Sequence, residues 1–118
     1  QAEGDPLLKA RIRSIARDRA RKRMISRVPE ATGVIVNPTH YAIALRYDLA
    51  VDAAPVVIAK GQDLIALKIR EVAESNGVSV VEDMALARPV YLSVEVDQIF
   101  PTELYEAVAQ IIIFLNRK

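Results

Sequence analysis

The chain has 118 residues, of which 52% are hydrophobic and 26% charged, so it is long enough for one globular domain with its own core and is not a disordered segment. It contains no cysteine, which excludes a disulfide framework, a thiol nucleophile and a cysteine-ligated zinc site. Apolar runs such as Ile111–Leu115 are too short to cross a bilayer, and no signal-peptide pattern is visible.

The net charge of +1 hides an uneven distribution along the chain. Residues 1–30 carry nine Lys/Arg and four Asp/Glu, a net charge of +5, whereas residues 31–118 carry seven and eleven, a net charge of −4. Such asymmetry suggests contact with nucleic acid or with a membrane surface. We expect two parts, a basic linker helix over residues 1–30 and a globular domain over residues 31–118.

The basic arm is predicted to form one helix that ends near Ser26. Asp5 as N-cap and Pro6 at the first helical position mark its start. Val28-Pro29 marks its end, because a residue that precedes proline avoids the α region. The apolar stripe of this helix is narrow and fades in its second half, so we expect it to project from the domain or to be partly frayed.

The remaining pattern predicts an α/β fold, a small mixed sheet of about four strands flanked by about four helices, with a projecting N-terminal basic helix. The strand–helix–strand unit in its middle is expected to be a parallel crossover. Pro89 is expected to fit a helix only in the first turn. In chain order, the expected elements are strands over Thr32–Val36, Tyr41–Tyr47 and Val56–Ala59, a helix that starts at Gly61–Asp63 and is closed by Asn76-Gly77, a strand over Val78–Val81, a short helix within Met84–Val96, and a helix over Thr102–Leu115.

The most reactive feature is the turn Asn37-Pro38-Thr39-His40 between the first two expected strands. The side-chain amide of an asparagine can attack its own backbone carbonyl, which cuts the chain and leaves a C-terminal succinimide on Asn37 and a free amine on Pro38. Pro38 lacks the N–H that the competing deamidation route requires, and it sets the φ needed at the second position of a β-turn. The sequence therefore predicts Asn37 as a nucleophile and Pro38 as its leaving group.

An amide is a weak nucleophile, so it needs orientation, a proton acceptor and stabilisation of the developing oxyanion. His40, the only histidine of the chain, can accept the amide proton or protonate the leaving prolyl nitrogen. Thr39 can orient the turn through its hydroxyl or simply favour extended geometry. The alternative interpretation is an ordinary Asn-Pro turn followed by a solvated histidine.

Other functional classes find little support in the sequence. Without a carboxylate pair or a histidine cluster, neither hydrolysis nor metal binding is expected, and Lys60-Gly61 lacks the spacing of a phosphate loop. The basic arm has no interleaved aromatic residues, which argues against a nucleic-acid binder. Residues 9–27 fit two interpretations, contact with an anionic membrane surface and a solvated linker helix.

An ordered series of segments resembles the FlhB/YscU family, the export-apparatus switch proteins of flagellar and injectisome type III secretion. The segments that carry the resemblance are Val36–Leu45, Ala54–Gly61, Leu64–Glu71, Val81–Asp83, Leu86–Arg88 and Pro101–Ala109. Ala59–Gly61 and Leu64–Glu71 are more similar to the flagellar branch. The sequence departs from the family at Pro89 and Asp97, where the family more often has Ala and Gly, and this affects the expected structure of residues 86–98 but not the turn.

The resemblance implies the C-terminal domain of an integral membrane protein, lying at the cytoplasmic face of the bacterial inner membrane, with the basic arm as the linker. In that family the Asn–Pro bond cleaves autocatalytically, the two pieces stay folded together, and the exporter changes substrate class from rod/hook-type to filament-type. By the same resemblance, Asn37 is the cyclising nucleophile, Pro38 the leaving group, and Thr39 and His40 assist. This is a single-turnover cut and not multi-turnover catalysis.

The resemblance also implies partners: other export-gate proteins, export substrates or their chaperones, and a hook-length control protein. Nucleic acid, metal and cofactor are not expected. The rival hypothesis is a structural docking module of a membrane-associated secretion complex in which the turn never cleaves.

Overall fold

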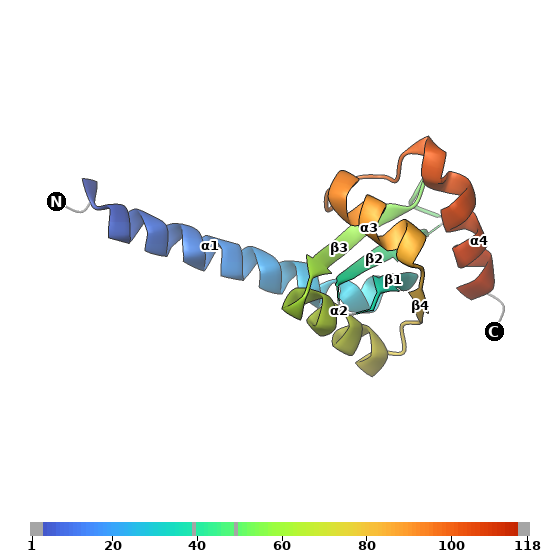
Figure 1. The fold of residues 1–118 in the computed structure, drawn as a ribbon, viewed down its shortest axis with the longest axis horizontal. Coiled ribbons are helices and arrows are strands. Elements are labelled where there is room, and N and C mark those ends of the chain that lie inside the picture. Colours follow the sequence, from blue (N-terminus) through green and yellow to red (C-terminus); the bar gives the residue numbers. More distant parts are fainter. Residues whose placement is uncertain (1–3, 39, 49, 116–118) are drawn as a thin grey trace.

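The chain folds into a four-stranded mixed sheet with helices on both faces, as predicted. The computed structural model describes residues 4–38, 40–48 and 50–115. In chain order its elements are α1 (Pro6–Ser26), a 3-10 turn (Val28–Glu30), β1 (Gly33–Asn37), β2 (Tyr41–Arg46), β3 (Val56–Gln62), α2 (Leu64–Ser75), β4 (Val80–Glu82), α3 (Met84–Ser93), a 3-10 turn (Thr102–Leu104) and α4 (Tyr105–Leu115) (Figure 1).

The strand order in the sheet is β3-β2-β1-β4. β1 pairs antiparallel with β2 and parallel with β4, and β2 pairs antiparallel with β3. β3 and β4 therefore run in the same direction, as the predicted parallel crossover requires. β1 lies inside the sheet with a strand on each side, and both faces of the sheet are covered, so its residues Val34, Ile35 and Val36 are all buried.

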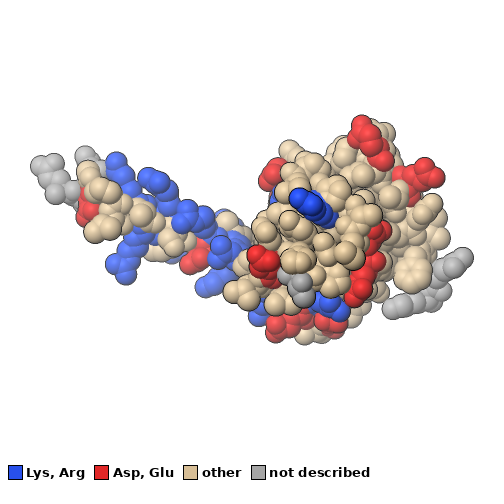
Figure 2. Space-filling model, viewed as in Figure 1, with Lys and Arg blue, Asp and Glu red and all other residues tan. Residues whose placement is uncertain are grey.

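Helix α1 extends away from the sheet, which confirms the predicted projecting helix (Figure 1). It starts as expected, because the Asp5 carboxylate accepts a hydrogen bond from the Leu7 N–H at 2.9 Å and Pro6 follows it. None of its residues, all of which the structure describes, is buried. Figure 2 shows mostly Lys and Arg side chains along this helix with few acidic ones, whereas Asp and Glu are frequent on the body. Just beyond it, Val28 is fully buried and ties the arm to the body.

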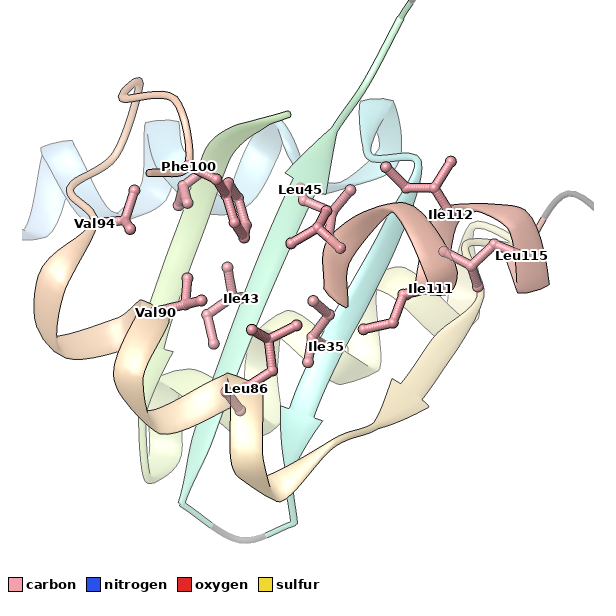
Figure 3. Close-up of a cluster of buried hydrophobic side chains, with 13 residues drawn as sticks. Ile35, Ile43, Leu45, Leu86, Val90, Val94, Phe100, Ile111, Ile112 and Leu115 are labelled. Atoms are coloured by element: carbon pink, nitrogen blue, oxygen red, sulfur yellow. The ribbon is translucent and has the colours of Figure 1, made fainter. Parts of the chain in front are cut away.

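Two apolar clusters cover the two faces of the sheet. On one face, side chains from α3 and α4 meet those of β1 and β2 (Figure 3). This cluster contains Phe100, the largest fully buried side chain among the described residues. On the other face, α2 contributes Ala66, Ile69 and Ala73. The core is otherwise built from Val, Ile, Leu and Ala, as the low aromatic content of 5% predicts.

Strand β3 is longer than predicted, because it continues through Lys60 and Gly61 to Gln62. These three residues pair with Ile43, Ala42 and Tyr41 of β2. A Cβ on Gly61 would collide with the side chain of Ile65, so glycine here allows the first turn of α2 to pack against the strand. The glycine acts as a close-approach residue within a strand and not as the start of the helix.

The expectation for Pro89 was wrong, because it lies at the sixth position of α3 and not in the first turn. Proline in a helix interior costs one backbone hydrogen bond and crowds the preceding turn. α3 tolerates it because the ring is exposed while Leu86, Ala87 and Val90 are buried against the sheet. The remaining boundaries shift by a few residues, and α4 is preceded by a 3-10 turn at its predicted start.

Candidate functional site

The Asn37–His40 segment is a tight turn that joins β1 to β2. Asn37 is the last residue of β1 and is paired with Tyr41, the first residue of β2. The His40 N–H donates a hydrogen bond to the Asn37 carbonyl oxygen at 3.0 Å, as in a β-turn. The turn predicted from the sequence is confirmed for Asn37, Pro38 and His40, whereas Thr39 lies outside the described residues.

The hydrogen bond from His40 has a chemical consequence, because its acceptor is the carbonyl that links Asn37 to Pro38. A donor aimed at a carbonyl oxygen draws electron density from the carbon and stabilises negative charge on the oxygen if the carbon is attacked. The backbone of His40 thus supplies one oxyanion donor, independently of its imidazole. This role was not predicted from the sequence.

The chain is held firmly on both sides of the turn. On the entering side, the Asp83 N–H donates to the Val36 carbonyl at 3.0 Å, and on the leaving side the Asp63 N–H donates to the His40 carbonyl at 2.9 Å. Asp63 adopts φ 55° and ψ −115°, a backbone region that glycine favours, and its side chain makes no capping hydrogen bond to α2. A strained residue therefore anchors the end of the turn.

The side chains at the turn differ in exposure. Asn37 and Pro38 are half-buried, and His40 is exposed. The His40 ring lies 6.4 Å from the ring of Tyr41, centroid to centroid, and no described residue hydrogen-bonds its imidazole. The imidazole is therefore open to solvent, while the backbone N–H of the same residue contacts the carbonyl of the Asn37–Pro38 bond.

A small hollow of about 10 Å³ adjoins the Asn37–Pro38 bond, with room for roughly one water molecule. Its wall combines the end of β1 and the turn with the first two turns of α2. The lining residues are Val36, Asn37, Pro38, Tyr41, Ala66, Leu67 and Arg70. The sequence alone does not connect α2 to the turn, because only the tertiary packing brings these segments together.

Tyr41 connects the turn to the opposite face of the sheet. Its ring lies 4.8 Å from that of Tyr91 in α3, centroid to centroid. The Lys60 ammonium lies 5.0 Å from the centroid of the Tyr91 ring, donates to the Tyr91 carbonyl at 2.8 Å and pairs with Glu95 at 3.3 Å. A contiguous contact path thus leads from the residue after the turn to the end of α3.

Within the described residues, no group of three or more His, Cys, Asp or Glu side chains is arranged to hold a metal ion. No helix in that same part of the chain is both long and apolar enough to cross a bilayer. The candidate site is therefore the peptide bond between Asn37 and Pro38.

Comparison with known proteins shows which family the chain resembles. The family described as "FlhB HrpN YscU SpaS Family" matches residues 1–115. The chain belongs to this family. It is 45% identical over 117 residues, 99% of the chain, to flagellar biosynthetic protein FlhB of Bacillus subtilis, and 49% identical over 118 residues to FlhB of Aquifex aeolicus. It spans about a third of each relative, 32% and 34% of their lengths.

Solved structures of the FlhB family share the fold. The cytoplasmic domain of FlhB from Shewanella putrefaciens is 44% identical, with a TM-score of 0.78 over 80% of this chain and 73% of that one. A mutated EscU C-terminal domain is 35% identical, with a TM-score of 0.75 over 78% of this chain and 92% of that one. Among the related EscU structures are variants of an asparagine, of the proline after it and of a histidine three positions after the asparagine. That spacing is the spacing of Asn37, Pro38 and His40.

Proposed function

We propose that this chain is the cytoplasmic switch domain of a FlhB-type component of flagellar type III protein export, and that it cuts its own backbone once, between Asn37 and Pro38. The observation that carries the proposal is the turn itself. Its scissile carbonyl already accepts a backbone hydrogen bond, and both flanks are held by backbone hydrogen bonds from Asp63 and Asp83, the N-cap residues of α2 and α3. The family membership supports the setting in protein export.

The cut needs no reagent from outside the protein apart from proton exchange, and water is used only when the ring opens afterwards. The Asn37 side-chain nitrogen attacks the Asn37 carbonyl carbon and loses a proton, and the negative charge gathers on the oxygen that faces the His40 N–H. The bond to Pro38 then breaks, and the prolyl nitrogen takes up a proton. The products are a C-terminal succinimide and a secondary amine, and water later opens the ring to leave a carboxylate.

The barrier for the cut follows from the time that it takes. Completion within minutes corresponds to a rate of ~10⁻³ s⁻¹ and to a barrier of roughly 21–22 kcal/mol. One preorganised oxyanion donor and one proton-transfer group, His40, are matched to that requirement. Pro38 contributes by closing the deamidation route and by shaping the turn. Thr39 is proposed to assist, as the resemblance implies.

The fold is suited to survive the cut. Cleavage leaves β1 on fragment 1–37, between β2 and β4 of fragment 38–118. The first fragment keeps Val28, Val34, Ile35 and Val36 buried, and full burial of each such side chain is worth ~1.5–3 kcal/mol. We therefore infer that the two fragments stay associated.

The cut changes the surface without unfolding the domain. It replaces a neutral amide with a prolyl ammonium and, once the ring opens, a carboxylate. It also frees the turn before Tyr41, whose ring contacts α3 through Tyr91. We propose that other export-gate proteins, export substrates or chaperones, and a hook-length control protein read this altered surface, and that the exporter then changes substrate class.

The domain is proposed to lie at the cytoplasmic face of the inner membrane, with α1 leading from a membrane portion. The chain spans about a third of its curated relatives, which leaves room for such a portion in the whole protein. α1 carries eight Lys/Arg and one Asp on an exposed helix, which suits contact with anionic lipid at ~1 kcal/mol per basic residue.

Size-exclusion chromatography of the purified wild-type domain tests the switch. In native buffer, fragments 1–37 and 38–118 should elute together, and in denaturant they should separate. Asn37→Ala should yield one unbroken chain under both conditions. If aged wild-type protein also remains one chain in denaturant, the domain is a docking module that does not cleave.

A further inference from the structure

Helix α2 places one cation beside the bond that is proposed to break. Arg70 lines the same small hollow as Asn37 and Pro38, and it is the only charged residue among the described residues of that hollow. The other lining residues from α2 are Ala66 and Leu67. The positive charge is therefore not offset by an acidic group within the hollow.

The position of Arg70 is set by the packing of α2. Its neighbour Ile69 is fully buried against the sheet, and the Asp63 N–H ties the start of the helix to the carbonyl of His40. The helix and the turn are thus parts of one rigid arrangement. Arg70 lies about two helical turns after this hydrogen bond, on the side that faces the end of β1.

Arg70 is only loosely engaged elsewhere. Among the described residues its ion-pair partner is Glu74, which its Nε approaches at 3.6 Å. The two side chains are 38% and 58% exposed, and such a surface pair along a helix contributes little. No described residue hydrogen-bonds the two terminal guanidinium nitrogens of Arg70.

We propose that Arg70 is an electrostatic supporting residue of the self-cleavage, one that favours the negative charge that develops on the Asn37 carbonyl oxygen. The inference rests on the proposed function. The His40 N–H donates to that oxygen, and tetrahedral intermediates are commonly stabilised by several positive or donor groups together. Arg70 adds a contribution from across the hollow, as a nearby charge and not as a group that exchanges protons.

This role differs from a structural one in its response to salt. A partly exposed charge acts through solvent, so its effect falls as the Debye length shrinks from about 30 Å at 0.01 M salt to about 3 Å at 1 M. Salt should therefore slow the cut when Arg70 is present and should have little effect when it is absent.

The test measures the rate of the cut directly after synthesis. The domain is made by cell-free translation, quenched in denaturant at timed intervals and measured by intact mass. Arg70→Gln should cut about tenfold more slowly than wild type, and Arg70→Lys, which keeps the charge, should restore most of the rate. The matched control is Lys68→Gln on the same helix, which removes an exposed charge outside the hollow and should leave the rate unchanged.

The outcomes separate the inference from the proposed function. If wild-type protein never cuts, the proposed function fails. If it cuts and Arg70→Gln cuts equally fast, or Lys68→Gln slows it as much, the role of Arg70 is refuted. A slow Arg70→Gln that keeps the salt dependence of wild type, or that lowers the melting temperature in an Asn37→Ala background, would also overturn the proposal, because the residue would then act by stabilising the fold.

Discussion

Replacing Asp63 with glycine should stabilise the domain, although glycine usually weakens the start of a helix. The residue has φ 55° and ψ −115°, and a non-glycine residue in such a region costs of order 1–3 kcal/mol. Glycine removes that strain but gains about 0.5–1 kcal/mol of conformational freedom in the unfolded chain. The hydrogen bond from the residue 63 N–H to the His40 carbonyl is a backbone bond and survives the change.

The comparison is sharpest between Asp63→Gly and Asp63→Ala. Both variants lack the carboxylate, so any interaction of that charge with the start of α2 cancels. The alanine variant keeps the strain, and the glycine variant should be more stable by about 1 kcal/mol. For a domain of this size that difference corresponds to roughly 4 °C in melting temperature.

The assay is thermal unfolding followed by circular dichroism, with both variants in an Asn37→Ala background so that no chain is cut. A glycine variant that melts at or below the temperature of the alanine variant would show that Asp63 is not strained. In that case the turn would be anchored by the backbone hydrogen bond of residue 63 without strain.

Three further predictions address stability and the chemistry of the turn. The Arg46 guanidinium, hydrogen-bonded to Asp52 at 2.8 and 3.0 Å, together with the Asp48 N–H, lowers the pKa of Asp52 from 3.8 to about 2. A carboxylate whose pKa is lower in the folded state than in the unfolded state stabilises the folded state at pH values above its unfolded pKa. The contribution of Asp52 should therefore be lost as the pH falls from about 4 to about 2. Over that range the melting temperature of Asp52→Asn should fall less than that of wild type. Gly33→Ala should destabilise the domain by about 1–3 kcal/mol in urea unfolding, because its Cβ would meet the Leu115 side chain of α4. His40→Ala should slow the cut without changing the melting temperature, because the imidazole is exposed while the backbone donor remains.

Each of these has an outcome that would contradict it. Equal acid sensitivity of wild type and Asp52→Asn would remove the Asp52 pair from the acid response. A Gly33→Ala variant as stable as wild type would mean that α4 does not pack closely on β1. An unchanged rate in His40→Ala would restrict the role of that residue to its backbone N–H.

The fold was predictable where local chemistry decides it. The ends of α1 follow from Asp5-Pro6 and Val28-Pro29, because capping and proline geometry act within a few residues. The two strands around the turn follow from their β-branched and alternating patterns. The end of β3 was predicted too early because Gly61 was interpreted as the start of the next helix. A glycine that makes room for a neighbouring side chain cannot be distinguished in the sequence from one that ends a strand.

The candidate site was predictable only in part. Asn37, Pro38 and His40 are contiguous and carry their chemistry in their residue types, so the turn could be located from sequence. The His40 N–H reaches the Asn37 carbonyl through the local geometry of the turn, whereas the strain at Asp63 and the approach of Arg70 arise from how α2 packs against the sheet. No spacing rule connects residue 70 to residue 37, because the connection is made by the tertiary structure.

The most direct test of self-cleavage is the mass of the N-terminal fragment immediately after it forms. Cyclisation of Asn37 predicts a fragment of residues 1–37 that is lighter by one water than the ordinary hydrolysis product and that gains this water on standing, while Asn37→Ala stays whole. A fragment that carries the full water from the first time point would indicate hydrolysis by another agent. A wild-type chain that never breaks would contradict the account altogether.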